Sequence, residues 1–216
     1  AEQMREINVN PHAILLEPVG KNTAPAITLA ALKAIDKNYD PTLLILSSDH
    51  KIDDEENFRK VITNGLLKSN LERLVTFGII PNSPETGYGY IRSFEELSEE
   101  NPSSTIEEFV EKPNLELAKK FVKDKHYVWN SGIFLFKASV FLKELEKFEP
   151  DILKICTQAL ENGLKDLDFF RINEEFFRKC PSKPIDIAVM EKTKIGSVLT
   201  LKAGWDDIGS WTSLWK

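Results

Sequence analysis

The sequence predicts an α/β fold, in which a doubly wound and mostly parallel sheet carries helices on both faces. Two observations predict it. Short apolar runs alternate along the chain with segments whose apolar residues recur at helical spacing, and this alternation is typical of right-handed crossover units. The run at residues 42–46 is nearly all apolar, as expected of a parallel strand that is buried on both faces.

Composition and charge limit the kinds of partner that we expect the protein to bind. The 216 residues are 42% hydrophobic and carry a net charge of -6, without a dense block of Lys or Arg. We therefore expect one domain over residues 1–216 that binds neither nucleic acid nor a membrane. Two cysteines, Cys156 and Cys180, are too few for a disulfide framework or a zinc site, which indicates reduced thiols and a cytoplasmic location. A homo-oligomer is compatible with the sequence.

The first strand–helix unit covers residues 13–37. An apolar run ends on Glu17 and Pro18, and a loop then leads to a segment rich in Ala, Leu and Ile. Thr23 is a suitable N-cap, which predicts a helix over 24–37. The backbone amides at the start of such a helix could bind a base or a phosphate.

The next strand, at residues 42–46, is followed by Ser47, Ser48 and the carboxylate of Asp49. Open α/β sheets bind ligands at the carboxyl ends of their strands. An Asp at this position can offer one carboxylate to Mg²⁺ while substrate phosphates supply other oxygen ligands. The alternative is that Ser48 and Asp49 only cap the helix predicted over 55–68. Agreement with distant acidic residues would favour the metal site.

A glycine-rich aromatic loop follows the strand predicted at 74–79. It contains Gly87, Tyr88 and Gly89. Glycine lets a ligand approach the backbone closely, and backbone amides beside a Tyr ring suit the hydroxyl rim and the C–H face of a sugar. The alternative is an ordinary hairpin turn.

Two further polar sites lie at strand termini. A strand over 106–110 leads to Glu111 and Lys112, which precede a proline. An adjacent acceptor and cation suit a phosphosugar, whereas the alternative is a surface ion pair. Asn130 lies where a strand through 133–136 begins, and its amide both donates and accepts hydrogen bonds, as recognition of a hydroxyl requires.

The remaining segments are interpreted as scaffold, with one exception. Helices are expected over 115–123, 139–148, 151–162 and 168–179. The exception follows the strand predicted at 195–201, where a glycine-bounded carboxylate pair contains Asp207. If Asp207 and Asp49 converge at one sheet edge, they form a two-carboxylate site for a metal bound to a triphosphate.

Eight short segments, in this order, resemble the mannose-1-phosphate guanylyltransferase family, and they span nearly the whole chain. They are residues 17–26, 48–50, 77–79, 84–91, 109–113, 129–132, 188–192 and 204–211. The resemblance is strongest to the bacterial branch that is sometimes fused to a mannose-6-phosphate isomerase domain. It implies the Rossmann-like fold of nucleotide-diphospho-sugar transferases.

The resemblance also implies an activity and a role for each matching residue. The activity is transfer of GMP from GTP to mannose 1-phosphate in the presence of Mg²⁺, which gives GDP-mannose and pyrophosphate. Asp49 and Asp207 would bind the metal, and Lys112 would contact the sugar phosphate or the α-phosphate. The mannose pocket would contain Gly87, Tyr88, Gly89, Glu111 and Asn130. The nucleotide site would include Glu17, Pro18, Asn22, Thr23, Ala24 and Ser48.

Departures from the family pattern limit what the resemblance implies. The family begins with a strand and a loop of the form G-G-x-G-x-R-L-x-P that holds the triphosphate, and this sequence contains neither. We therefore expect a chain that is truncated at its N-terminus and inactive, or nearly so, by itself. Lys21 stands where many relatives have Arg, and Ile187 where a Tyr is common. No β-helix or cupin sequence follows Trp215, so we expect no isomerase activity from this chain.

Two alternatives to GMP transfer onto mannose 1-phosphate stay open at this point. The same fold and reaction could serve another base or another sugar. A non-catalytic sugar-nucleotide-binding subunit could also retain the pocket without turnover.

Overall fold

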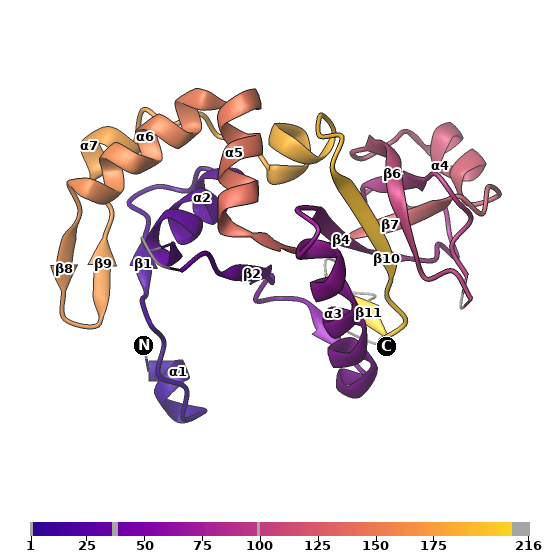
Figure 1. The fold of residues 1–216 in the computed structure, drawn as a ribbon, viewed down its shortest axis with the longest axis horizontal. Helices are drawn as coiled ribbons and strands as arrows, with labels where there is room; N and C mark the ends of the chain where they lie inside the picture. Colours follow the sequence, from indigo (N-terminus) through magenta and orange to yellow (C-terminus); the bar gives the residue numbers. More distant parts are fainter. Residues whose placement is uncertain (1, 36–38, 99, 209–216) are drawn as a thin grey trace.

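The computed structural model describes residues 2–35, 39–98 and 100–208. Its main feature is a six-stranded sheet with the strand order β2-β7-β4-β10-β6-β5 (Figure 1). In that order the strands are β2 (Thr42–Ile45), β7 (Tyr127–Lys137), β4 (Leu74–Ile79), β10 (Gly196–Thr200), β6 (Ser103–Val110) and β5 (Tyr90–Ser93).

The sheet is mixed, so the prediction of a mostly parallel sheet is wrong. Among its described pairings, β4 and β10 are parallel. The long strand β7 runs antiparallel to β2, β4 and β5, and β6 runs antiparallel to β10 and β5. Strands β2 and β4 share a direction but are separated by β7, so they are not the parallel neighbours that the strand–helix alternation predicted.

Helices lie against both faces of this sheet. Helix α3 (Glu55–Ser69) contacts β4, β7 and β10, and α5 (Ala138–Phe148) contacts β7. Ile133 and Leu135 of β7 pack with residues of α3, whereas the alternate residues Phe134 and Phe136 belong to the other core, which contains Phe141 of α5. Because successive side chains of a strand point to opposite faces, burial on both sides explains the continuous apolar run in β7.

A helical layer and a small sheet form the other end of the molecule (Figure 1). Helix α6 packs against α2, α5 and α7. The small sheet has the order β1-β9-β8. These elements are α2 (Thr23–Ala34), α6 (Pro150–Glu161), α7 (Glu174–Phe177), β1 (Leu15–Leu16), β8 (Leu164–Asp166) and β9 (Phe169–Arg171). Cys156 and Cys180 are buried in this layer with their Sγ atoms 3.9 Å apart.

Two expectations for individual elements are wrong. The helix predicted over 168–179 is strand β9 followed by the short helix α7, because β9 pairs with both β1 and β8. Strand β2 is not buried on both faces. It pairs only with β7 among the described strands. Leu44 in the strand is 36% exposed, and Leu46, which follows the strand, is 53% exposed.

The remaining short elements are α1 (Glu2–Glu6), β3 (Lys51–Ile52), α4 (Leu115–Phe121), the π-helix η1 (Asp186–Met190) and β11 (Trp205–Asp206). No helix among the described residues is both long enough and apolar enough to cross a bilayer. The last three residues of the family-like segment 204–211 lie outside the described residues.

Candidate functional site

A cleft of about 430 Å³ brings together residues that are far apart in the sequence. Eight of the predicted site residues line it: Thr23, Gly87, Tyr88, Gly89, Glu111, Lys112, Asn130 and Asp207. They come from the start of α2, the loop before β5, the end of β6, strand β7 and the segment after β11.

Asp207 is held in this cleft by Tyr88, whose Oη donates a hydrogen bond to Asp207 Oδ1 (3.0 Å). The Tyr88 ring packs edge-on against Trp129 and Trp205, with centroid distances of 5.2 and 5.6 Å. Burial and the Asp207 carboxylate both raise the pKa of Tyr88. Its hydroxyl therefore stays protonated and acts as a donor that orients Asp207.

Asp49 is exposed and does not line the cleft, but its segment runs beside that of Asp207. Strands β3 and β11 are antiparallel, with Trp205 opposite Ile52. Strand β3 begins two residues after Asp49, and β11 ends one residue before Asp207. The indole Nε1 of Trp205 also donates to His50 Nδ1 (3.2 Å). The fold thus joins the two segments that carry the predicted metal ligands.

The donors near this ladder fit a metal that is shared with a substrate. Among the described residues, no group of three or more His, Cys, Asp or Glu side chains is arranged to hold a metal ion. Mg²⁺ is usually bound through one or two carboxylates together with substrate phosphates and water. Two aspartates on adjacent segments match that chemistry better than they match a site made of protein ligands alone.

Gly89 is the glycine that the cleft requires. Its carbonyl accepts a hydrogen bond from the Asn130 backbone N–H (2.8 Å), and a Cβ at this position would lie 2.6 Å from Glu111 Oε2. The Glu111 carboxylate therefore packs on bare backbone. Gly87 is exposed, and a Cβ there would meet no atom within 4 Å.

Glu111 and Lys112 differ in their position within the cleft. The Lys112 Nζ lies 3.5 Å from Glu111 Oε1, but the Lys112 side chain is 64% exposed and that of Glu111 only 21%. Lys112 also has a positive φ of 47°. The ion pair that was the alternative to a phosphosugar site thus exists, with Glu111 inside the cleft and the ammonium group at its mouth.

Asn130 is almost buried and has partners at both ends of its side-chain amide. Its Oδ1 accepts from Thr76 Oγ1 (3.0 Å) and its Nδ2 donates to Asp186 Oδ1 (2.9 Å). The sequence predicted a group that both donates and accepts hydrogen bonds. In the structure, one bond of each kind is made within the protein.

Asp186 lines the cleft, and sequence reasoning did not identify it as a site residue. It lies on the π-helix η1. Burial raises the pKa of its carboxyl group to about 6, and the negative charge of Glu111 adds to this shift. Two signals could have identified it: a lone carboxylate within the apolar run 185–190, and the association of π-helical turns with functional sites.

The polar groups at the start of α2 make hydrogen bonds mainly to other groups of the protein. Asn22, rather than the expected Thr23, is the N-cap, and its Oδ1 accepts from Thr23 N (2.8 Å). The Thr23 hydroxyl accepts from Ile185 N (2.9 Å), and Ala24 N donates to Lys183 O (3.1 Å). Ala24 is fully buried. The Thr23 hydroxyl and the Ala24 amide therefore hold the segment that leads to Asp186, while the Thr23 amide donates to Asn22. This geometry does not support a phosphate contact through the two amides.

The other residues predicted for the nucleotide site do not line the cleft, although Ser48 follows the lining residue Ser47. Glu17 and Pro18 follow β1, and Ser48 is exposed in the loop after β2.

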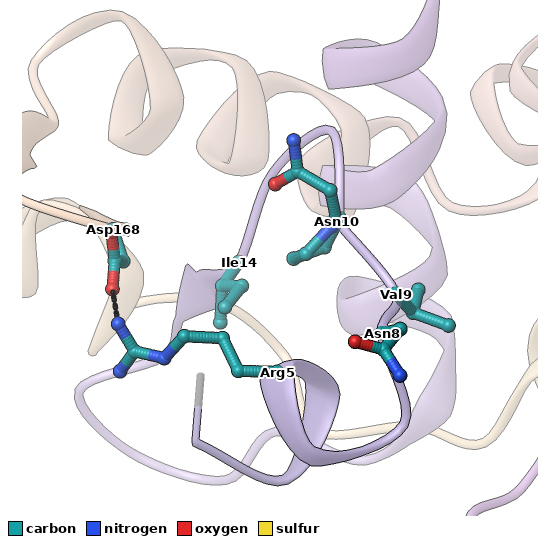
Figure 2. Close-up of a pocket in the computed structure, with 7 residues that line it drawn as sticks. Arg5, Asn8, Val9, Asn10, Ile14 and Asp168 are labelled. Carbon is teal, nitrogen blue, oxygen red and sulfur yellow. Dashed lines mark ion pairs between the residues drawn. The ribbon is translucent and has the colours of Figure 1, made fainter.

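A second cavity, of about 390 Å³, lies beside α1 and contains no predicted site residue. Figure 2 shows Arg5 reaching across it to Asp168, with 3.4 Å between Arg5 Nη1 and Asp168 Oδ2. Functional assignment therefore rests on the first cleft.

Comparison with known proteins places this chain in a family. The family model of nucleotidyl transferases matches residues 1–216. The mannose-1-phosphate guanylyltransferase of Salmonella montevideo is 51% identical over 220 residues, which cover 100% of this chain and 46% of that protein. The chain thus spans about half the length of the curated relatives that it matches.

Two solved structures share the fold and part of the sequence. A Helicobacter pylori structure named mannose-6-phosphate isomerase is 34% identical, has a TM-score of 0.85, and matches 95% of this chain and 79% of its own. A Thermus thermophilus structure named mannose-1-phosphate geranyltransferase is 31% identical, has a TM-score of 0.80, and matches 92% of this chain and 56% of its own.

Nucleotidyl transferases of this type generally use a divalent metal, which agrees with the carboxylates near β3 and β11. Because the family model matches the whole chain, the protein belongs to the nucleotidyl transferase family.

Proposed function

We propose that this chain carries the sugar-binding and metal-binding residues of an enzyme that transfers GMP from GTP to α-D-mannose 1-phosphate. The products are GDP-mannose and pyrophosphate. The observation that carries the proposal is that one cleft contains Glu111, Lys112, Asn130 and Asp207. The names of the curated relatives, which include several mannose-1-phosphate guanylyltransferases, support this choice of substrates.

The inner part of the cleft suits the sugar. Glu111 is an acceptor when ionised, and Asn130 can both donate and accept. These two groups match a ring of hydroxyls, while the carboxylates of Glu111 and of Asp186 behind Asn130 would repel a phosphate. The backbone around Gly87 and Gly89 permits close approach of the sugar ring.

The mouth of the cleft suits the phosphates. Lys112 offers a compact positive charge with three donors, which can bind the sugar phosphate or the α-phosphate. An oxygen of mannose 1-phosphate attacks the α-phosphorus of GTP, a new P–O bond forms, and the bond to pyrophosphate breaks. No covalent enzyme intermediate is needed. Lys112 then lowers the barrier by positioning the phosphates and stabilising their charge.

Asp49 and Asp207 would hold Mg²⁺. When bound, the cation would offset the negative charge that develops as pyrophosphate leaves. Tyr88 serves this function indirectly, because its hydrogen bond fixes the direction of the Asp207 carboxylate. Ligand carboxylates are commonly oriented by such partners.

The name of the Helicobacter pylori relative raises isomerisation of mannose 6-phosphate as a second candidate. Isomerisation needs a group that moves a proton between neighbouring carbons of the sugar, whereas nucleotidyl transfer needs a cation and a metal site beside the phosphates. The carboxylate-bearing segments at β3 and β11 favour transfer.

One assay separates these functions. The full-length gene product is incubated with Mg²⁺, mannose 1-phosphate and, in turn, GTP, dTTP or UTP, and pyrophosphate and the sugar nucleotide are measured. We expect GDP-mannose from GTP and much slower reactions with the other nucleotides. Preference for dTTP or UTP, or for glucose 1-phosphate, would assign a related transferase. Conversion of mannose 6-phosphate without nucleotide would assign the isomerase, and tight binding without turnover would assign a binding subunit.

A further inference from the structure

A chain of hydrogen bonds runs along the wall of the cleft from Thr76 through Asn130 to Asp186. Thr76 is fully buried and Asn130 is 9% exposed. A side-chain amide has two N–H donors and two lone pairs. The described bonds use one of each, which leaves one N–H and one lone pair of this cleft-lining residue for a ligand hydroxyl.

Thr76 does not by itself fix which way the Asn130 amide points. Its Oγ1 lies 3.0 Å from Asn130 Oδ1 and also 3.0 Å from the carbonyl oxygen of Ile133. A hydroxyl has a single proton and can also accept. Thr76 could therefore donate to Asn130 Oδ1, or donate to Ile133 and accept from Asn130 Nδ2.

Asp186 removes this ambiguity. An ionised carboxylate only accepts hydrogen bonds, so the Asn130 atom that faces it must be Nδ2. We propose that Asp186 is a positioning residue, whose carboxylate sets the orientation of the Asn130 amide and thereby determines which hydroxyl pattern the cleft recognises. The identity of the ligand, mannose 1-phosphate, rests on the proposed function.

The charges around Asp186 make this orientation sensitive to pH. The carboxylates of Glu111 and Glu191 face Asp186 and disfavour its ionisation, and burial acts in the same direction and contributes most. Lys112 is paired with Glu111. Once protonated, Asp186 can donate to Asn130 Oδ1, and the amide can turn over with Thr76 as acceptor.

A double-mutant cycle on the full-length protein tests whether Asp186 acts through Asn130. Binding of mannose 1-phosphate and of GTP is measured separately by calorimetry at pH 7.5 for the parent protein, Asp186→Asn, Asn130→Ala and the double variant. We expect Asp186→Asn to weaken sugar-phosphate binding about tenfold and to leave GTP binding within about twofold. The double variant should bind no more weakly than Asn130→Ala, because the two changes remove one interaction. Additive losses would overturn the proposal.

Glu116→Gln is the matched control for charge. It removes the same charge from a side chain on α4 that is 80% exposed, and it should leave both affinities within about twofold, as surface changes usually do. A tenfold loss of sugar-phosphate affinity in this control would show that net charge, rather than orientation of Asn130, causes the effect.

A substrate-free measurement separates this inference from the proposed function. The side-chain amide signals of Asn130 are followed by NMR between pH 5 and pH 8. We expect them to shift with a midpoint near 6, to lose this response in Asp186→Asn, and to keep it in Thr76→Val. Signals that do not respond to pH, or that lose their response in Thr76→Val instead, would overturn the inference. If the amide titrates but mannose 1-phosphate does not bind, the positioning role stands and the proposed function fails.

Discussion

Single residues decide which groups can approach one another in the cleft, and the two glycines of the aromatic loop illustrate this. The sequence offers Gly87 and Gly89 as equivalent positions. In the structure their surroundings differ, since only Gly89 lies against the Glu111 carboxylate and the Asn130 backbone.

Substituting these glycines should therefore affect the fold unequally. Gly89→Ala forces the end of the flexible Glu111 side chain to swing aside and crowds the Phe109 ring, and we expect it to lower the free energy of unfolding by about 1 kcal/mol, the low end for overpacking. Gly87→Ala, the matched control, should change it by less than about 0.5 kcal/mol. Urea unfolding of both variants measures the difference. Equal stabilities would show that Glu111 does not need the space beside Gly89.

Asp186 should reduce stability at neutral pH. Its pKa is raised to about 6 from an ordinary value of 3.8, so the folded protein favours the protonated form. The stabilisation from this shift is complete below pH 3.8 and is lost as the pH rises through 6. Asp186→Asn should therefore be about 1–3 kcal/mol more stable than the parent protein at pH 8, and this advantage should shrink towards pH 4. Unfolding curves at several pH values test this, and lower stability of the variant at pH 8 would contradict it.

Tyr88 and Asp207 should differ in how they affect turnover. Asp207→Asn should abolish activity and leave the fold intact, because an amide is a poor ligand for Mg²⁺. Tyr88→Phe keeps the ring contacts with Trp129 and Trp205 but loses the hydrogen bond to Asp207. We expect it to raise the Mg²⁺ concentration needed for half-maximal activity about 10–100-fold. Near-normal rates for Asp207→Asn would remove this residue from the site.

At the scale of elements, the segment that carries Asp186 is tied to the helical layer. Glu149, between α5 and α6, accepts hydrogen bonds from Lys183 (2.7 Å) and Lys192 (2.6 Å), which flank η1. Burial of Glu149 opposes its ionisation, but the two lysines outweigh this and lower its pKa below the ordinary value of 4.5.

Removing the negative charge of Glu149 should weaken its hydrogen bonds to Lys183 and Lys192 and so loosen η1. We expect Glu149→Gln to lower the free energy of unfolding by about 1–3 kcal/mol, less than for a fully buried pair because both lysines are partly exposed. Since the pKa is lowered on folding, the contribution of Glu149 is present above pH 4.5 and is lost as the pH falls below it. Thermal unfolding at pH 7 and pH 3.5 measures this. A destabilisation that is larger at pH 3.5 would contradict the account.

The sequence predicted elements well where local periodicity decides them. The helix expected over 55–68 is α3, and the strands expected at 74–79 and 195–201 are β4 and β10. The sequence-based predictions failed where pairing between strands that are far apart in the chain determines the structure. Residues 169–171 became a strand because β1 and β8 offer partners on both sides, and β7 made the sheet mixed because its neighbours β2 and β4 are far away in the sequence.

At the scale of the whole molecule, the cleft exists because loops from both halves of the chain meet at one place. Sequence motifs identified most of its polar residues, including Glu111, Lys112 and Asn130. They could not reveal that Asn130 is held by Asp186, since 56 residues separate the two. The proximity of the Asp49 and Asp207 segments likewise depends on the β3–β11 pairing, which short strands do not predict.

A crystal structure of the full-length protein with GDP-mannose and Mg²⁺ tests the proposed function at this scale. We expect the mannose ring between Glu111 and Asn130, the phosphates beside Lys112, and carboxylate oxygens of Asp49 and Asp207 about 2.1 Å from the cation. A metal bound elsewhere, or a sugar nucleotide outside this cleft, would contradict the assignment of these residues to one transferase site.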